Sequence, residues 1–375
     1  MQAFSWYIHG RCAKNMSIKY CIGRLSMKKI FVLILAFCAV MCSLIPAYAL
    51  DVSARSAVLI DADSGSVLYQ KDADVRLPMA STTKIMTALV ALENADTDTV
   101  VTIPPEAVGV EGSSVCLKAG ESMTLGELLY AVLLESANDA AAAVAFAVGG
   151  SIEDFAVMMN EKATSMGLEN TSFANPHGLD SENHYTSARE LAIIAAEALE
   201  NESFKEIVGT YRHKIPMSTG GYRYLLNHNK MLKLYDGAIG VKTGFTKKSG
   251  RCLVSAAERD GLRLVAVTLN APDDWRDHSA MLDYGFGSYE MKTLAREGEY
   301  CFTLDCIGKK ITQIRAVNKS GVSMCLSKNG GEITQTVCLP RFVYAPVNEG
   351  DKLGYIEFVR DGNIIASLDL FASAG

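Results

Sequence analysis

The sequence predicts an α+β fold in which helices cover an antiparallel sheet, followed by a small all-β domain. Strand-like segments stand at both ends of a helix-rich block that runs from about 124 to 200, and short strands and turns fill the chain from about 291 onward. Strands that flank a helical block join one sheet when the helices pack on its face. With 375 residues and 49% hydrophobic content, the chain is long enough for two domains with sizeable cores.

The first 49 residues are not expected to belong to this fold. Residues 27–49, "MKKIFVLILAFCAVMCSLIPAYA", have a basic start, an apolar centre and an Ala-Tyr-Ala end, which is the pattern of a signal peptide cleaved after Ala49. An uncleaved anchor is the alternative, but the apolar run is short for a spanning helix. We therefore expect 1–49 to be an upstream segment and signal peptide, 50–290 a catalytic domain and 291–375 a β-rich domain, outside the cytoplasm.

Local signals predict the individual elements. Residues 56–74 hold two apolar runs around a turn-like Asp-Ser-Gly-Ser, which indicates a β-hairpin. A helix-period run covers 81–93, and Ser-Ala-Arg-Glu at 187–190 is typical of a capping box. Strands return at "GAIGVKTGF", "GRCLVSAAE" and "LRLVAVTLNA", with a tight turn at Asp260-Gly261 between the last two. We expect the N-terminal hairpin to join these C-terminal strands.

Composition excludes several classes of function. The net charge of −6 gives no basic surface for nucleic acid. The sequence has no His-Glu-x-x-His, no Cys-x-x-Cys and no His-rich spacing, so neither a metal nor another cofactor is expected. Six of the ten cysteines follow the leader, namely Cys116, Cys252, Cys301, Cys306, Cys325 and Cys338. Outside the cytoplasm these could form disulfides or remain unpaired thiols, and the sequence leaves both readings open.

The segment "MASTTKIMTALVALE" places Ser81 three residues before Lys84, where an apolar helical run begins. A cap and a surface lysine would explain the pair in structural terms. The same spacing also puts a nucleophile and a base on one helical face, at a helix start that favours developing negative charge. Ser-x-x-Lys alone is weak evidence, because it also occurs at Ser26–Lys29 in the leader.

Two further motifs follow in order. Ser136-Ala137-Asn138 ends an apolar run, and Lys242-Thr243-Gly244 lies in a strand-like segment. With these motifs the chain resembles the penicillin-binding, serine-type D-alanyl-D-alanine carboxypeptidases, which share the β-lactamase/transpeptidase-like fold. The blocks "LPMASTTKIMTALVAL", "LLESANDAAAAVA", "NPHGLDSENHYTSARELA", "GVKTGFTKKSGRCLVSA" and "WRDHSAMLDYGF" extend the resemblance over 55–290, and "APVNEGDKLGYIEFVRDGNIIASLDL" resembles the β-rich C-terminal domain of the family.

The chemistry requires these residue types. A serine attacks only when a base takes its proton, and a lysine can do so only when its pKa falls from about 10.4 toward neutrality. Desolvation lowers the pKa of Lys84, and a nearby Lys242 would lower it further. Ser136 can relay a proton to the leaving nitrogen, and Asn138 can hold Lys84 or the substrate amide; the resemblance implies the same roles. It also implies an oxyanion hole at the N–H groups of Ser81 and Phe245.

The resemblance further implies a substrate, a peptidoglycan stem peptide ending in D-Ala-D-Ala, lying along the strand that contains Lys242, Thr243, Gly244 and Phe245. Thr243 and Arg276 would bind its terminal carboxylate, and β-lactam antibiotics would be covalent inhibitors. His177 is expected either to line the cleft or to serve a structural turn. Many family members end in an amphipathic helix on the membrane surface; this chain ends at "SLDLFASAG", so membrane attachment is not expected from this pattern.

Two alternative functions compete with the carboxypeptidase reading. A class A β-lactamase would carry a deacylating glutamate in Glu-x-x-Leu-Asn, which is absent between Ser136 and Lys242. A non-catalytic penicillin- or peptidoglycan-binding module would be expected to have lost part of the set, yet Ser81 and Lys84 are both present. Six histidines raise the alternative of a Ser-His-Asp hydrolase, but the sequence contains no Gly-x-Ser-x-Gly motif around a nucleophilic serine.

Overall fold

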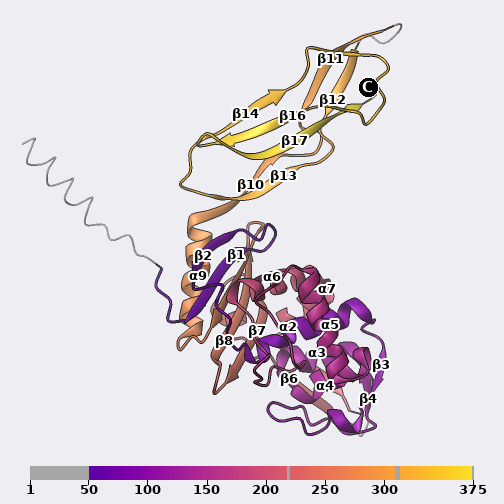
Figure 1. The fold of residues 1–375 in the computed structure, drawn as a ribbon, viewed down its shortest axis with the longest axis vertical. Helices are drawn as coiled ribbons and strands as arrows, with labels where there is room; N and C mark the ends of the chain where they lie inside the picture. The colour runs from indigo at the N-terminus through magenta and orange to yellow at the C-terminus, as the bar shows by residue number, and fades with distance from the viewer. Residues whose placement is uncertain (1–49, 218–219, 309–312, 374–375) are drawn as a thin grey trace, which may run out of the picture. The chain divides into compact units, whose positions relative to one another are not determined.

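A five-stranded antiparallel sheet organises the N-terminal domain in the computed structural model, which describes residues 50–217, 220–308 and 313–373 (Figure 1). The strand order is β2-β1-β9-β8-β7. The strands are β1 (Ser56–Asp61), β2 (Val67–Lys71), β7 (Ala238–Thr246), β8 (Gly250–Arg259) and β9 (Leu262–Leu269). Because β1 pairs with β9, the N-terminal hairpin joins the C-terminal strands, which confirms the predicted arrangement. The leader prediction lies outside the described residues.

Helices cover both faces of the sheet. They are α2 (Lys84–Asn94), α3 (Leu125–Leu134), α4 (Asn138–Gly149), α5 (Ile152–Ser165), α6 (Ala188–Leu199), α7 (Glu202–Gly209), α8 (Met231–Leu234) and α9 (Asp274–Ser288). Alternate residues of β1 point to opposite faces, so Val58 and Ile60 join one buried cluster and Ala57 and Leu59 join another. The first cluster contains α2 to α7, and the second contains α8 and α9.

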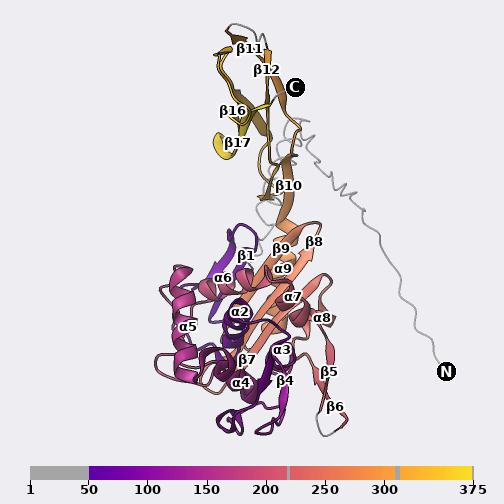
Figure 2. The ribbon, with the colours of Figure 1, turned by 90° about the vertical axis from the view of Figure 1, so that its right-hand side faces the viewer.

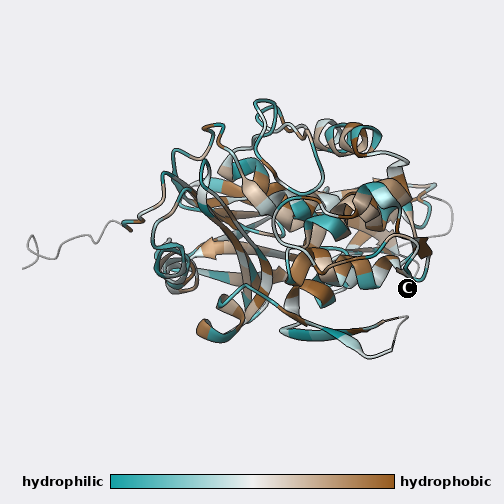
Figure 3. Cartoon of the chain, turned by 90° about the horizontal axis from the view of Figure 1, so that it is seen from below, coloured by the Kyte–Doolittle hydropathy of each residue, from teal (hydrophilic) through white to brown (hydrophobic). Residues whose placement is uncertain are grey.

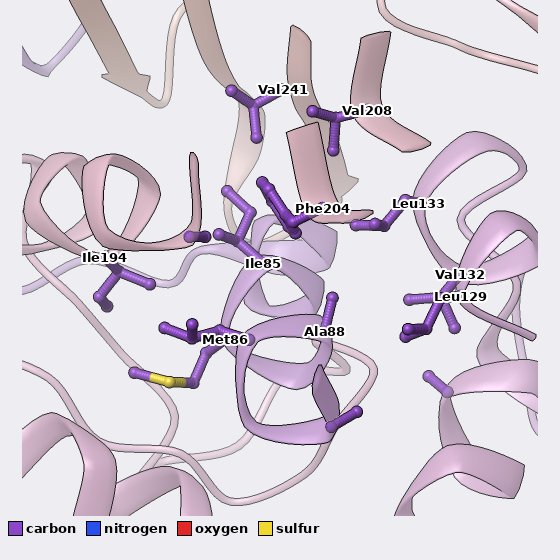
Figure 4. Packing of buried hydrophobic residues seen from close by; sticks show 14 of the residues in the cluster. Ile85, Met86, Ala88, Leu129, Val132, Leu133, Ile194, Phe204, Val208 and Val241 are labelled. Atoms are coloured by element: carbon purple, nitrogen blue, oxygen red, sulfur yellow. The ribbon is translucent and has the colours of Figure 1, made fainter. Parts of the chain in front are cut away.

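Helix α2 lies inside the first cluster. Ile85, Met86 and Ala88 are buried against side chains from α3, α6, α7 and β7 (Figure 4). Teal and brown alternate along the helices around the sheet, as expected when one face of each helix packs inward (Figure 3). This packing fixes the start of α2, where the predicted nucleophile and base lie.

The helix-rich block that the sequence predicts from about 124 to 200 is interrupted by a long non-helical segment. Residues 167–187 form an irregular segment held by bridges such as Ser172–Tyr185 and Leu77–Thr186. Ser187 does cap α6 by accepting the N–H of Glu190. The Glu190 carboxylate accepts N–H groups of this irregular segment, at Asn170 among others, so the predicted capping box is only half formed.

Short elements complete this domain. They are the 3₁₀ turns η1 (Ala80–Thr83) and η2 (Pro105–Ala107), the pair β3 (Val100–Thr102) and β4 (Ser122–Thr124), and the hairpin β5 (Arg212–Pro216) and β6 (Tyr222–Leu226). The turn between β8 and β9 has positive φ at both Asp260 and Gly261, which confirms the predicted tight hairpin.

The chain continues from α9 into an all-β region with its own core. Strands β10 (Tyr289–Ala295) and β13 (Val322–Ser327) pair, and a six-stranded sheet has the order β14-β16-β17-β12-β11-β15. Its strands are β11 (Cys301–Ile307), β12 (Gln313–Val317), β14 (Ile333–Cys338), β15 (Phe342–Tyr344), β16 (Lys352–Arg360) and β17 (Asn363–Ser373). Both sheets contribute to one cluster, since Leu294 and Leu326 pack with Phe358.

The six cysteines in the described part of the chain are all free thiols; Cys252 and Cys306 are buried. Of the two readings left open by the sequence, the structure has unpaired thiols. Within the same residues no single helix is long and apolar enough to cross a membrane; α4 and α5 reach that length only together and are bent by 80°.

Candidate active site

Ser81 lies in the 3₁₀ turn η1, and the regular helix α2 begins only at Lys84, three residues later than the predicted start of the helical run. Ala80, directly before it, is buried and has φ of +49°, a conformation that a residue with a Cβ rarely adopts. Strain of this kind persists only where surrounding structure holds it, and it is common at functional sites. The turn separates Ser81 from the regular helix while leaving Lys84 at the first position of α2.

Lys84 is completely buried, and three oxygens surround its Nζ. Nζ lies 3.0 Å from Ser81 Oγ, 2.7 Å from Asn138 Oδ1 and 2.5 Å from the backbone oxygen of His177. Burial lowers the pKa of Lys84 well below its usual value, and the charge of Lys242 lowers it further. A neutral amine can therefore face the serine hydroxyl, as general-base chemistry requires.

The second motif also reaches this group. Ser136 has φ of +60° and lies between α3 and α4, and both Ser136 and Asn138 are buried. Asn138 accepts from Lys84 and donates its Nδ2 to the backbone oxygen of Glu111. The adjacent Asp139 carboxylate accepts the hydroxyl of Ser114 and nearby backbone N–H groups, which fixes the loop beside the motif.

Strand β7 supplies the third motif and forms an edge of the sheet. Lys242 is buried, and desolvation lowers its pKa to about 7. A Cβ on Gly244 would lie 3.1 Å from the backbone N of Ser81 and 3.1 Å from the oxygen of Met79. A side chain here would be in tight contact with the nucleophile turn, so glycine eases the close approach of β7, and Phe245 follows directly on the strand.

The motifs meet at a cleft of about 370 Å³. Its lining contains Ser81, Ser136, Thr243, Gly244 and Phe245 from the predicted set, together with Ser113, His228, Lys230, Arg251, Cys252, Asp274 and Trp275. In the described residues no group of three His, Cys, Asp or Glu side chains is arranged to bind a metal. The cleft thus combines hydroxyl, amine and guanidinium groups.

Arg276 is not brought into this lining. Its side chain is 66% exposed, and its Nε lies 3.4 Å from Oδ2 of Asp273, the residue before α9. Arg251 stands in the cleft instead, with Nη2 donating to the buried Asp274 at 2.8 Å and its guanidinium 5.6 Å from the centre of the Trp275 ring. The cleft therefore contains a cation from β8, the strand next to β7, while Arg276 lies outside its lining.

Sequence reasoning missed Arg251, although a signal existed. The turn at 247–249 sets the register of β7 and β8, which pairs Phe245 with Arg251 and so places both on one face. His177 was named, but its functional atom is the backbone oxygen that accepts from Lys84. Its ring is buried, and desolvation lowers its pKa to about 3, so it stays neutral.

His228 has no motif around it that would have revealed it. Its Nε2 lies 3.3 Å from Oε2 of Glu135, the residue before Ser136. The Glu135 carboxylate also accepts the N–H of Leu226, which ties the end of β6 to the second motif. Glu135 also favours the charged form of Lys242.

Two protein-family models match the sequence of this chain. A family model described as D-alanyl-D-alanine carboxypeptidase covers residues 44–273, and one described as penicillin-binding protein 5, C-terminal domain, covers 289–374. The chain belongs to the D-alanyl-D-alanine carboxypeptidase family. It is therefore a serine-type peptidase of this family, and the predicted class of enzyme and β-lactamase/transpeptidase-like fold are confirmed.

Relatives in this carboxypeptidase family span most of the chain. The D-alanyl-D-alanine carboxypeptidase DacF of Bacillus subtilis is 36% identical over 324 residues, 84% of this chain and 83% of the relative. The crystal structure of penicillin binding protein 5 from Haemophilus influenzae covers 86% of this chain and 97% of its own, with a TM-score of 0.72 and 27% identity. The Streptomyces K15 DD-transpeptidase structure covers 63% and 98%, with a TM-score of 0.60 and 34% identity.

Proposed function

We propose that this family member removes the terminal D-alanine from peptidoglycan stem peptides through an acyl-enzyme on Ser81. The observation that carries the proposal is the fully buried Lys84, whose Nζ lies 3.0 Å from Ser81 Oγ beside a second buried lysine, Lys242. Neutral Lys84 takes the hydroxyl proton, and Ser81 attacks the carbonyl of the penultimate residue. The N–H groups of Ser81 and Phe245 bind the developing oxyanion.

The leaving amine and the water step use the same groups. Ser136 relays the proton from Lys84 to the nitrogen of the departing D-alanine, while Asn138 keeps Lys84 oriented at 2.7 Å. Water then attacks the ester, with Lys84 again as the base. The Lys242 charge favours neutral Lys84 and faces the negative end of the substrate.

The substrate lies as an added strand on the edge of β7, with its carboxylate near Thr243. We propose that Arg251 supplies the cation for that carboxylate, because it lines the cleft while Asp274 holds its other side. Arg276, two residues into α9 from Asp274, remains the candidate implied by the resemblance and would have to leave Asp273 to act. The two assignments make different predictions for single variants.

Trapping the acyl-enzyme tests the nucleophile. Purified protein incubated with penicillin should gain the mass of one drug molecule on the peptide that contains Ser81, and the adduct should persist for minutes or longer. Free D-alanine should appear when the protein is given a pentapeptide ending in D-Ala-D-Ala. Rapid multiple turnover of penicillin would favour a β-lactamase, and label on another residue would refute the assignment of Ser81.

The remaining proposals concern location and domains. Because the substrate lies in the cell wall, we propose that residues 27–49 direct secretion, that the mature chain starts at Leu50, and that the enzyme acts outside the cytoplasm in wall biogenesis and cell shape. The catalytic domain would span 50–290 and the β-rich domain 291–375. N-terminal sequencing of the exported protein tests the cleavage site; retention of the apolar segment in membranes would contradict it.

A further inference from the structure

A second hollow opens beside the catalytic cleft. This side pocket has a volume of about 480 Å³ and is lined by Tyr211, Leu226, Asn227, His228, Lys230, Lys233 and Leu234. His228 and Lys230 also line the catalytic cleft, so the two hollows share a wall. Figure 2 shows α8, which carries Lys233 and Leu234, and the hairpin of β5 and β6, which ends at Leu226, on the same side of the sheet.

In the proposed pose, the side pocket lies beyond the leaving-group end of the substrate. Its helix α8 packs against β7 and precedes it in the chain, and burial lowers the pKa of His228, with a further contribution from the charge of Lys242. The other end of β7 reaches the irregular segment, where Thr246 Oγ1 donates to Asp180. A carbonyl at the N–H of Phe245 and a carboxylate at Thr243 orient the substrate's C-terminus toward the start of β7, and so toward the side pocket.

The lining is apolar with a cationic rim. Leu226 and Leu234 are 41% and 61% exposed, large fractions for leucines beside a cleft. The Lys233 Nζ lies 3.8 Å from the centre of the Tyr211 ring, and its methylene stem covers further apolar surface. The Lys230 backbone oxygen accepts from α8, but its side chain makes no hydrogen bond or ion pair with any described residue, so its charge is available at the rim. Such a pocket suits an aliphatic chain that ends in a carboxylate.

We propose that the side pocket binds the side chain of the residue on the leaving side of the scissile bond, and that it accepts D-amino acids whose aliphatic side chain is longer than methyl and ends in a carboxylate. The proposal rests on the proposed function, since it uses the acyl-enzyme on Ser81. D-alanine fills only the carboxylate site and leaves the side pocket empty.

The same site then supports acyl exchange with a free D-amino acid. The amine nitrogen of the incoming residue attacks the ester carbon on Ser81, an amide bond forms and the bond to Oγ breaks. The amine loses a proton through Lys84, and Oγ regains one. The acceptor carboxylate occupies the place that the D-alanine carboxylate has left, and its side chain enters the side pocket.

The test measures how the acyl-enzyme on Ser81 divides between hydrolysis by water and transfer to an added amino acid. A tripeptide donor ending in D-Ala-D-Ala is supplied with equal concentrations of D-alanine or D-2-aminoadipate, with L-2-aminoadipate as the stereochemical control, and the products are separated by mass. Each buried methylene favours binding about fourfold, so D-2-aminoadipate should give at least ~10-fold more exchange than D-alanine. The L-isomer should give none.

Variants locate the effect. Leu226→Asp and Leu234→Asp should each remove most of the preference for D-2-aminoadipate. The rate of D-alanine release from the donor should stay within about twofold of the unmodified enzyme. If an aspartate variant does not fold, the milder Leu226→Ala takes its place. Val157→Asp, at an exposed apolar position of α5, is the matched control. Equal exchange of both acceptors, or a preference that survives every leucine variant, would overturn the proposal. Loss of penicillin label on Ser81 in the unmodified enzyme would instead refute the proposed function.

Discussion

The contrast between Arg251 and Arg276 gives the sharpest test of substrate recognition. A carboxypeptidase must distinguish a free chain end from a chain interior, and the terminal carboxylate is the distinguishing group. The structure places Arg251 in the cleft, where Asp274 accepts one of its N–H groups at 2.8 Å, and leaves Arg276 66% exposed on α9. We therefore expect Arg251→Ala to weaken selection for the free acid, and Arg276→Ala to change it little.

The size of the effect follows from the geometry. A hydrogen bond to a charged group contributes about 1.5–3 kcal/mol, or about tenfold to a hundredfold in rate. The Arg251 side chain is 43% exposed, and Asp274 already accepts a hydrogen bond from its guanidinium, so the lower end of that range applies. In the unmodified enzyme, the free acid should react at least ~10-fold faster than the same peptide with an amidated terminal D-alanine.

The assay is kcat/KM for D-alanine release from the acid and for D-alanine amide release from the amide. Arg251→Ala should slow the acid about tenfold and bring the two rates close together. Arg251→Lys should recover part of the difference, because charge returns without the planar fork. If Arg276→Ala erases the difference and Arg251→Ala does not, Arg276 must leave Asp273 when substrate binds, and the assignment of Arg251 is wrong. Equal rates in the unmodified enzyme would remove both arginines from the site.

Three further predictions test the catalytic group. Lys84→Ala should slow acylation by penicillin about 10²–10⁴-fold, and Lys84→Arg should not restore it, because arginine stays charged; near-normal labelling of the arginine variant would place the base elsewhere. Lys242→Met removes a charge that lowers the pKa of Lys84, so the pKa of Lys84 should rise. The acid limb of the acylation–pH profile should then move to higher pH. If that limb does not move, the two amines are not coupled. Gly244→Ala puts a Cβ 3.1 Å from the backbone N of Ser81 and should slow acylation up to about 10²-fold. The thermal midpoint should stay near that of the unmodified protein. Unchanged acylation would place the oxyanion site elsewhere.

Much of the fold could be predicted because its signals are local. Short apolar runs mark β1 and β9, which pair in the sheet, and Asp260-Gly261 marks the turn of the β8–β9 hairpin. The three motifs also lie close to the positions that their sequences suggested, which were the start of a helical run, the end of an apolar run and a strand. Here local propensity and the tertiary structure agree.

The rest depended on contacts between distant segments. The carbonyl of His177 that holds Lys84 is a backbone atom, which no side-chain pattern can mark. Predicting that Arg251 reaches the cleft required the register of the β7–β8 hairpin. The position of Arg276 depends on the direction in which its long, exposed side chain leaves α9. The irregular segment at 167–187 was included in the predicted helix-rich block, but Gly167 has φ of +73° just after α5, and Pro176 and Gly178 disfavour a helix further along.

Two glycines explain why the nucleophile turn has its unusual backbone. Gly178 has φ of +93°, and a Cβ there would lie 2.0 Å from the oxygen of Ala80; a Cβ on Gly244 would press on the other side of the turn, 3.1 Å from Ser81 N. The turn is therefore packed between the irregular segment and β7, with no space for a Cβ at Gly178 and only a tight contact for one at Gly244. This packing holds Ala80 at a φ of +49°, a conformation that costs of order 1–3 kcal/mol. The glycines in "NPHGLD" and "VKTGF" are thus steric parts of the site, because they let two distant segments hold Ser81 away from the regular helix that its own sequence would otherwise form.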